Sequence, residues 1–409
     1  MDYRKDTSSI MKFLFLFVNL PNLQIGGNLY SDLVNEFINN GHDIYAASIG
    51  ENTITEVCNE NGAKVLRFYS IKTTYLSGVK KALTYQYIAY KLAKLIPKYF
   101  KNVKFDAIIS HTLPPEIGLT LWWLKRDFHC LHYLIVSDFL WQDGVSLGIF
   151  GEKNPICIYY KIIEHIMFKN ADLFSTPSRA TIDFSKKYYL NFDESKCQIV
   201  RWWQNVPKIN VDKKAVREQY GLGDKFVVIY GGSIGLMQRG NYLLDLAYSV
   251  RDYENILFLL FGKGDYLEEI KLQVDDLGLH NIKYQEFIPQ QEYNKLLSVC
   301  DVGMIILNEK VGTPNIPSKT VSYYCYGIPI LASVDKITDL GNLLATDGTG
   351  LCSLSGDNET FKSNLLKMYS DKNLLKRMSD NEQRIYSECM TAESAYHAIV
   401  EQIKSYKHV

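Results

Sequence analysis

The chain has 409 residues, which is too long for one compact core, so two domains are the simplest expectation. It is 47% apolar and 22% charged, as is ordinary for a globular protein, and its net charge of zero gives no sign of a nucleic-acid partner. The eight cysteines contain no C-x-x-C pair. This is typical of reduced cytoplasmic thiols and unlike a disulfide framework or a zinc site.

The N-terminal half begins with the pattern of a doubly wound α/β domain. Residues 13–18 form a near-continuous apolar run, which predicts a parallel strand buried on both faces. A loop with Gly26 and Gly27 follows, then a helix whose apolar positions recur every four residues from Leu29, and then a strand from Asp43. The loop lacks the G-x-G-x-x-G spacing, so the glycines are expected to let a substrate approach the backbone closely.

A basic, tyrosine-rich segment comes next. Residues 61–105 contain ten lysines and arginines but no acidic residue, and 79–101 predicts a basic amphipathic helix. We expect this helix to lie on an anionic membrane face; a solvated helix packed on a sheet is the alternative. Trp122 and Trp123 are expected to pack in the core, with an interfacial anchor as the alternative.

Two polar residues follow predicted strands in this half. His111 comes after the strand 106–110, and Asp138 comes after the strand 131–136. Open α/β sheets bind ligands at the carboxyl ends of their strands, so both are candidate catalytic residues, with Trp141 as a nearby acceptor contact. The alternatives are a structural histidine and a carboxylate that caps local backbone.

After a polar stretch from 207 to 224, which we interpret as a linker, the pattern restarts. A strand at 226–230 leads into the glycine-rich loop 231–240, and a strand at 256–261 ends in Gly262-Lys263-Gly264. A further apolar strand, 302–307, precedes the start of a helix. There Ser318 is predicted to cap the helix, Pro317 suits its first turn, and Lys319 with the helix N-terminus predicts a phosphate site.

These motifs in this order resemble bacterial glycosyltransferases of the GT-B fold, in the retaining family 4 branch that builds capsule, O-antigen and other surface polysaccharides. The segment 109–119 resembles that branch's strand-His-Pro-Pro motif, and 317–329 resembles its Pro-Ser-Lys…Gly-x-Pro motif. The resemblance implies an α/β fold of two doubly wound, Rossmann-like domains facing a central cleft. The acceptor domain would span 1–206, the donor domain 207–386, and the C-terminal helix 387–409 would cross back to the first domain.

The resemblance also implies roles for residues. Donor-binding residues would be Gly232, Ser233, Arg239, Lys263, Pro317, Ser318, Lys319 and Ser322; acceptor-binding residues would be Gly26, Gly27 and Trp141; catalytic residues would be His111 and Asp138. The chain departs from the family where two glutamates are usual, since Pro314 and Ser322 occupy those positions. Arg239 and Lys319 would then neutralise the donor diphosphate without a metal ion.

The protein is expected to be a hexosyltransferase that uses a nucleoside-diphosphate sugar as donor and a polyprenyl-diphosphate-linked saccharide as acceptor. A UDP-sugar is the first choice of donor and a GDP-sugar the second. Such an enzyme would be cytoplasmic and peripherally bound to the inner membrane through 79–101. The alternatives are an epimerase of the same fold and a catalytically idle sugar- or nucleotide-binding partner of an assembly complex.

Overall fold

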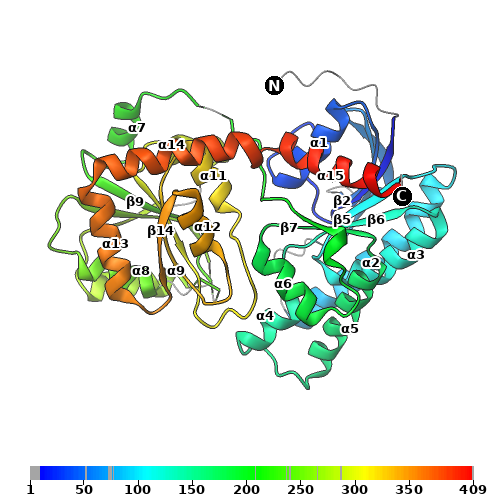
Figure 1. Ribbon diagram of the computed structural model, residues 1–409, viewed down its shortest axis with the longest axis horizontal. Coiled ribbons are helices and arrows are strands. Elements are labelled where there is room, and N and C mark those ends of the chain that lie inside the picture. Colours follow the sequence, from blue (N-terminus) through cyan, green and yellow to red (C-terminus); the bar gives the residue numbers. More distant parts are fainter. Residues whose placement is uncertain are drawn as a thin grey trace. The chain divides into compact units, whose positions relative to one another are not determined.

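The protein is described by a computed structural model, in which the chain divides into two compact units (Figure 1). The structure describes residues 10–50, 53–71, 76, 78–207, 209–235, 237–238, 241–264, 266–285 and 288–407, without the side chains of 79, 233, 263 and 285. Unit 1 comprises Met1–Val145, Phe150–Arg201 and Ala392–Val409, and unit 2 comprises Ser146–Ile149 and Trp202–Thr391.

Unit 1 is built on an eight-stranded sheet in the order β3-β4-β2-β1-β5-β6-β7-β8. All neighbours are parallel except β3 and β4, which form an antiparallel edge. The strands are β1 Lys12–Leu16, β2 Asp43–Gly50, β3 Glu56–Glu60, β4 Ala63–Tyr69, β5 Ala107–His111, β6 Leu131–Ile135, β7 Leu173–Thr176 and β8 Cys197–Ile199. The helices are α1 Leu29–Asn39, α2 Gly78–Phe100, η2 Pro115–Ile117, α3 Gly118–Phe128, α4 Leu140–Ser146, α5 Pro155–Asn170, α6 Arg179–Tyr188, η3 Glu194–Lys196 and α15 Ala392–Lys407.

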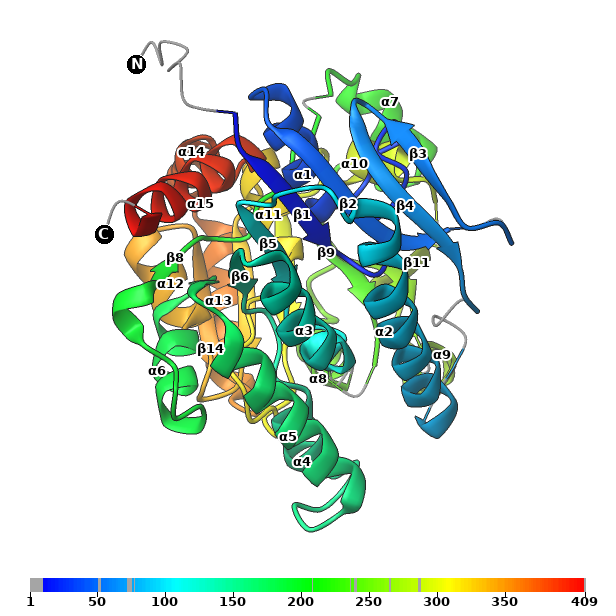
Figure 2. The same ribbon diagram turned by 90° about the vertical axis from the view of Figure 1, so that its right-hand side faces the viewer.

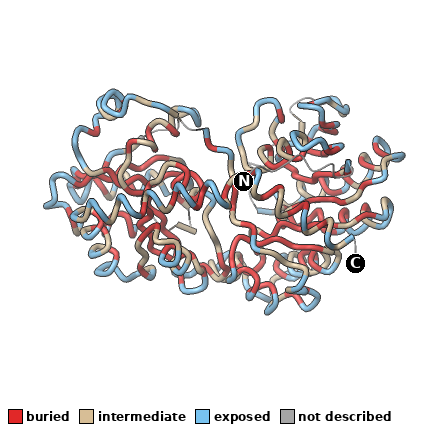
Figure 3. The backbone as a smooth tube through the Cα atoms, turned by 45° about the horizontal axis from the view of Figure 1, so that its top comes forward, coloured by how far each residue is buried: buried red, intermediate tan, exposed pale blue. Residues whose placement is uncertain are grey.

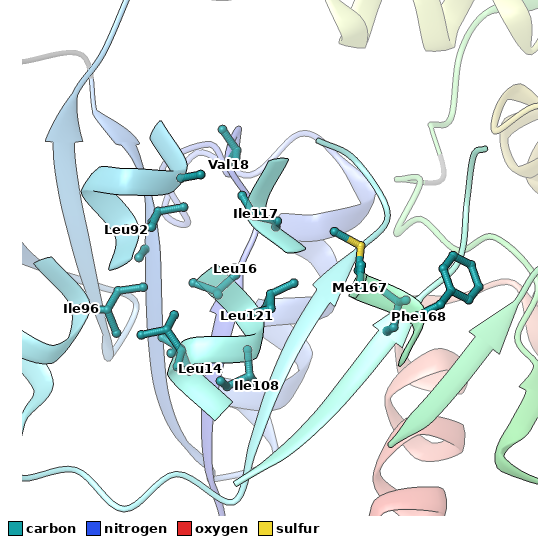
Figure 4. Packing of buried hydrophobic residues seen from close by; sticks show 14 of the residues in the cluster. Leu14, Leu16, Val18, Leu92, Ile96, Ile108, Ile117, Leu121, Met167 and Phe168 are labelled. Atoms are coloured by element: carbon teal, nitrogen blue, oxygen red, sulfur yellow. The ribbon is translucent and has the colours of Figure 1, made fainter. Parts of the chain in front are cut away.

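The apolar run at the start of the chain serves both faces of this sheet. Successive side chains of a strand point to opposite faces. Leu14 and Leu16 therefore join one core cluster with α2 and α3 (Figure 4), while Phe13 packs on the other face against Phe37 of α1, with ring centroids 4.8 Å apart. Burial on both faces explains why the sequence pattern is continuous rather than alternating.

Helix α15 completes the second face of unit 1. Its Tyr396 packs edge-to-face on Phe37 of α1, with ring centroids 4.9 Å apart, and its hydroxyl is 2.9 Å from Nε2 of His42. Gln402 donates a hydrogen bond to the carbonyl of Lys196 at 2.9 Å. The last helix of the chain thus belongs to the same core as the first strands.

Unit 2 is a six-stranded parallel sheet in the order β11-β10-β9-β12-β13-β14. Its strands are β9 Phe226–Ser233, β10 Ile256–Lys263, β11 Ile282–Gln285, β12 Val302–Ile306, β13 Ile330–Val334 and β14 Gly350–Leu354. Its helices are α7 Lys213–Gln219, α8 Asn241–Ser249, α9 Leu267–Asp276, α10 Gln290–Leu297, α11 Lys319–Tyr326, α12 Leu340–Asp347, α13 Asn358–Ser370 and α14 Lys372–Cys389. In each unit the central strands are buried and the outward helix faces are exposed (Figure 3).

The polar segment interpreted as a linker is partly helical, and that interpretation was wrong for residues 212–224. Asp212 caps α7 by accepting hydrogen bonds from the backbone N–H groups of Lys214 and Ala215. Arg217 then donates to the carbonyls of Gly223 and Val299, which fastens the segment to unit 2. Apart from the short segment Ser146–Ile149, which is grouped with unit 2, the chain passes from unit 1 to unit 2 at 201/202 and returns at 391/392.

A search of the helices that the structure describes finds none long and apolar enough to span a bilayer.

Candidate functional site

The strand order places one candidate site in unit 2. Strand β9 lies between β10 and β12, so the chain connections leave it in opposite directions. Ligands of open α/β sheets bind at such a reversal, outside the carboxyl ends of the strands. Gly232 lies at the carboxyl end of β9, and the register pairs it with Gly262 of β10.

Lys319, the first residue of α11, reaches this strand end. Its Nζ lies 4.1 Å from the ring centroid of Tyr230 on β9. A Cβ built on Gly232 would lie 3.5 Å from the same Nζ, so the ammonium group is directly beside the glycine backbone. Gly232 has φ +117°, a conformation that favours glycine. A bare backbone beside a lysine at a helix N-terminus is an arrangement suited to a phosphate group.

Burial changes the acid–base behaviour of Lys319. Desolvation lowers the pKa of its ammonium group to about 7. Part of the population is therefore neutral near pH 7, and an anion bound at Nζ would favour the charged form. Tyr230, whose ring the ammonium group covers, also has a raised pKa because it is buried. This aromatic partner could not be predicted from sequence, because Tyr230 lies inside an apolar strand.

The capping role predicted for Ser318 was wrong. Ser318 has helical dihedrals, φ −61° and ψ −20°, and its side chain makes no capping hydrogen bond. A capping serine needs extended backbone to reach the N–H groups of the next turn. Instead, the carbonyl of Pro317 accepts from the N–H of Thr320 at 3.1 Å and from its hydroxyl at 2.9 Å.

The other donor-side predictions have mixed outcomes. Ser322 lies within α11 and is 9% exposed. Arg239 lies outside the described residues, and the side chains of Ser233 and Lys263 are not described either. The register does pair Lys263 with Ser233 across β10 and β9, which puts both positions at the same end of the sheet as Gly232.

A second candidate site lies in unit 1, at the corresponding reversal of its sheet. There β1 lies between β2 and β5, so the loop after β1 and the end of β5 meet at the same edge. Thr112, just past β5, ties this edge to the end of β6. Its hydroxyl accepts hydrogen bonds from the N–H groups of Ser137 and Asp138, each at 3.2 Å. The structure therefore brings His111 and Asp138 to neighbouring strand ends, as the sequence pattern predicts.

His111 is held as a neutral imidazole. Its Nδ1 accepts a hydrogen bond from the N–H of Leu113 at 3.2 Å, so the ring proton is on Nε2. Burial lowers the pKa of His111 to about 3, which excludes the imidazolium form at neutral pH. Tyr30 of α1 stacks on the imidazole, with ring centroids 4.6 Å apart and planes 16° from parallel.

Asp138 shares this environment with Tyr30. Burial raises the pKa of the Asp138 carboxyl, and a hydrogen bond from Ser137 opposes the shift. The phenol pKa of Tyr30 is also raised, first by burial and then by the charge of Asp138. Tyr30 was not among the predicted site residues, because the helical spacing from Leu29 gave no reason to place the next residue at the strand ends.

The loop after β1 is held by a buried ion pair. Arg67 of β4 and Glu60 of β3 lie 2.7 Å apart, and Glu60 accepts a hydrogen bond from the N–H of Leu23 at 2.8 Å. Arg67 donates to the carbonyls of Leu20 and Pro21 at 2.6 and 2.9 Å. These bonds fix the chain that leads into the glycine pair.

Gly26 and Gly27 both have positive φ, +68° and +110°. Among the described residues, none other than the chain neighbours of Gly27 has an atom within 4 Å of a Cβ built on it, so the backbone there is open on that side. The pair therefore provides an unshielded stretch of backbone next to α1, as expected for close approach of a substrate.

Trp141 does not belong to this group. It is 7% exposed, its indole packs edge-to-face on Tyr188, and Nζ of Lys161 lies 5.0 Å above the ring. This burial leaves little of the Trp141 ring for contact with an acceptor substrate. Among the described residues, no group of three or more histidine, cysteine, aspartate or glutamate side chains could hold a metal ion.

Comparison with known proteins agrees with this architecture. The fold is similar to that of HepE from Anabaena, whose structure was solved in complex with UDP and glucose. The superposition covers 97% of this chain and 100% of the HepE chain, with a TM-score of 0.71 and 15% sequence identity. The fold is therefore that of GT-B glycosyltransferases, two Rossmann-like units each built on a parallel sheet.

Sequence comparison adds the class of the domain. Residues 212–385 match the family described as glycosyl transferases group 1. The probable glycosyltransferase WbjE of Pseudomonas aeruginosa is 22% identical over 274 residues, 63% of this chain and 66% of WbjE. The chitobiosyldiphosphodolichol β-mannosyltransferase of Dictyostelium discoideum is 29% identical over 105 residues, 25% of this chain and 21% of that enzyme. The chain thus spans less than two thirds of either relative. The residues that match this family lie in unit 2, and these matches support the expectation of a transferase enzyme.

Proposed function

We propose that the protein transfers a sugar from a nucleoside-diphosphate sugar to a lipid-linked saccharide at the inner face of the cytoplasmic membrane. The observation that carries this proposal is Nζ of Lys319 beside the bare backbone of Gly232, at the chain reversal of a glycosyltransferase domain. The donor diphosphate would bind there, with UDP favoured because HepE was solved with UDP.

The proposed reaction proceeds with retention at the anomeric carbon. The acceptor hydroxyl attacks that carbon as its bond to the phosphate oxygen breaks, and the hydroxyl proton passes to the departing phosphate. Lys319 stabilises the negative charge that develops on the nucleoside diphosphate, together with the helix N-terminus. Because these groups can supply the charge, we propose that no divalent cation is needed.

The unit 1 site would orient the reacting groups. A neutral His111 with its proton on Nε2 can donate a hydrogen bond to a sugar or acceptor oxygen without taking part in proton transfer. Asp138 would accept a hydrogen bond from the acceptor, and the backbone at Gly26 and Gly27 would pass close to it. The Dictyostelium relative acts, by its name, on a diphosphodolichol-linked saccharide, which supports a lipid-linked acceptor.

The membrane contact proposed for 79–101 has support from exposure. Helix α2 contains no acidic residue and exposes Lys94, Lys98 and four large apolar side chains: Leu83, Tyr87, Tyr90 and Tyr99. Lysines interleaved with tyrosines on one helix face suit an anionic lipid surface.

Two neighbouring helices extend this surface. Helix α3 contacts both α2 and α5 within unit 1 (Figure 2). Trp122 and Trp123 of α3 are each 39% exposed, so the expectation that they pack in the core was wrong. Ile158 and Ile162 of α5 are exposed as well. We call α2, α3 and α5 together the basic-aromatic face, and we propose that it docks the enzyme for synthesis of a surface polysaccharide such as capsule or O-antigen.

The proposal is tested by nucleotide binding without metal and then with magnesium. UDP, GDP and their sugar conjugates are titrated into wild type, Lys319→Ala and a control, Lys376→Ala, whose lysine is 75% exposed on α14. We expect one nucleotide to bind wild type and the control without metal, and at least tenfold more weakly to Lys319→Ala. Equally poor binding of every nucleotide to all three proteins would overturn the donor site. Binding without transfer or donor hydrolysis would favour an idle binding protein, and turnover of a nucleotide sugar without acceptor would favour an epimerase.

A further inference from the structure

The charge of Lys319 is compensated by an aromatic ring rather than by a carboxylate. Among the residues that the structure describes, no acidic side chain forms an ion pair with its Nζ, and burial is the one cause that shifts its pKa. Instead, Nζ lies 4.1 Å from the ring centroid of Tyr230. A cation over an aromatic ring is attracted by the negative face of the ring, most strongly where water is excluded.

Packing fixes the ring of Tyr230 in this position. Tyr230 is 3% exposed and belongs to the buried core cluster of unit 2, together with Val228 and Ile306. Residues two positions apart on a strand point to the same face of the sheet, so Tyr230 and Val228 share the core face of β9. A side chain in a close-packed core keeps one rotamer. The ring therefore stays in place whether or not an anion is bound beside it.

The backbone of Lys319 is fixed as well. The N–H and the hydroxyl of Thr320 donate to the carbonyl of Pro317 at 3.1 and 2.9 Å, which closes the turn before α11. The indole N–H of Trp202, also in unit 2, donates to the carbonyl of Ile316 at 2.7 Å. The lysine side chain is the flexible part between this turn and the ring, so the ring determines where Nζ lies.

An aromatic partner suits an anion site better than an acidic one. A carboxylate beside Lys319 would repel a phosphate and would have to be displaced when the phosphate binds. The ring of Tyr230 carries no net charge, so it can hold the ammonium group while Nζ donates hydrogen bonds to an anion. A Cβ built on Gly232 would lie 3.5 Å from the same Nζ, so an anion would meet the ammonium group and the glycine backbone together.

We propose that Tyr230 is a positioning residue, whose ring holds Nζ of Lys319 beside Gly232, where it meets the donor diphosphate. Tyr230 acts through Lys319 and does not itself contact the donor. Without the ring, the lysine side chain would occupy several rotamers and the affinity for a diphosphate would fall. This inference rests on the proposed function, because it concerns the binding of the donor assigned there.

Calorimetric titration of the full chain with UDP and, separately, with inorganic pyrophosphate tests this role. The variants are Tyr230→Phe, which keeps the ring, Tyr230→Leu, which removes it, and Tyr230→Leu in a Lys319→Ala background. The matched control is Tyr248→Leu. Cζ of Arg251 lies 4.1 Å from the ring centroid of Tyr248, so this variant removes another cation–π contact of unit 2, where the chain leads into β10.

We expect UDP to bind the control as it binds wild type, Tyr230→Phe within about twofold of wild type, and Tyr230→Leu about tenfold more weakly. In the Lys319→Ala background, Tyr230→Leu should cause no further loss, because the ring has no ammonium group to hold. The proposal is overturned if Tyr230→Leu costs the same factor in that background, if Tyr230→Phe loses as much as Tyr230→Leu, or if neither loses affinity.

A graded series covers the case in which Tyr230→Leu does not fold, as judged by circular dichroism. Phenylalanines with increasing numbers of ring fluorines are placed at position 230, because fluorine withdraws charge from the ring face with little change of shape. UDP affinity should fall stepwise with the number of fluorines, and a constant affinity would overturn the proposal.

Pyrophosphate separates this inference from the proposed function. If wild type binds pyrophosphate but no nucleotide, the nucleotide donor is refuted, and the same order of affinities measured with pyrophosphate still supports or overturns the role of Tyr230. If wild type binds neither ligand, both proposals are overturned.

Discussion

Tyr30 and His111 stack face to face at the sheet edge of unit 1, with ring centroids 4.6 Å apart and planes 16° from parallel. The two residues come from different elements, the first turn of α1 and the end of β5. The stack fixes the plane of the imidazole while the N–H of Leu113 fixes its tautomer. Together they leave Nε2–H as a donor with a defined direction, which is what a positioning group requires.

Removing the stack between Tyr30 and His111 should therefore lower kcat. We expect Tyr30→Ala to reduce kcat about fivefold, because an aromatic pair contributes about 1 kcal/mol and its loss frees the imidazole. Tyr30→Phe keeps the ring and should stay within about twofold of wild type. The measurement is steady-state transfer, with circular dichroism as the control for folding. Equal losses in both variants would mean that the hydroxyl, near Asp138, matters more than the stack.

Nucleotide binding should be coupled to proton uptake at Lys319. Its pKa is lowered to about 7 by burial, so part of the free protein is neutral there. A bound diphosphate would raise that pKa, since an opposite charge favours the protonated form. Affinity should be greatest below pH 7 and should fall as the pH rises through 7 toward the pKa of the bound state.

Calorimetric titration in buffers of different ionisation enthalpy checks this coupling. At pH 7.5 the observed enthalpy should vary between buffers as expected for net proton uptake on UDP binding. Lys319→Arg, whose guanidinium stays charged, should bind without proton uptake. An enthalpy that does not depend on the buffer in wild type would show that Lys319 is already protonated when free, contrary to its burial.

The buried strands could be predicted from sequence because burial on both faces requires a continuous run of apolar residues. Apolar runs mark β1, β9 and β12 as strands covered on both faces, and all three strands are present in the sheets at these residues. Strand β3, with the sequence EVCNE, carries two glutamates at an antiparallel edge and gave no such signal. Edge strands commonly carry charged residues, so they lack the apolar pattern by which a strand is recognised in a sequence.

The candidate sites were predictable only in part, for a similar reason. His111, Asp138 and Lys319 follow strands or open a helix, so their positions relative to the sheet could be expected from order alone. Tyr30 and Tyr230 were missed because their roles depend on contacts between elements distant in sequence. Ser318 was misassigned because residue type favours a cap while the observed dihedrals of the turn do not permit one.

The basic-aromatic face should bind anionic vesicles in a salt-sensitive way. Each lysine near such a surface contributes about 1 kcal/mol, so Lys94→Gln/Lys98→Gln should weaken binding about thirtyfold at low ionic strength. Trp122→Ala should weaken it too, but with less dependence on salt. Sedimentation with phosphatidylglycerol vesicles measures both effects, and Lys214→Gln/Lys376→Gln on unit 2 is the charge-matched control. Equal losses in the control pair would point to net charge rather than to this face.

The ion pair of Arg67 and Glu60, which holds the loop after β1, should contribute strongly to stability. Their side chains are only 12% and 4% exposed, so Arg67→Met leaves a buried carboxylate without its partner. Breaking a buried pair in this way costs about 3–5 kcal/mol of unfolding free energy. The loss also frees the carbonyls of Leu20 and Pro21, so the backbone leading to Gly26 loses its anchor.

A double-mutant cycle separates the charge from the anchor. Arg67→Met/Glu60→Gln should recover part of the stability that Arg67→Met loses, because it removes the unpaired charge, but it should not recover acceptor KM, because the carbonyls remain unbound. Urea unfolding gives the first quantity and transfer kinetics the second. The exposed pair of Arg179 and Glu194 is the control, and Arg179→Met should change neither quantity appreciably. If stability and acceptor KM recover together, the ion pair stabilises unit 1 as a whole without positioning the glycine loop.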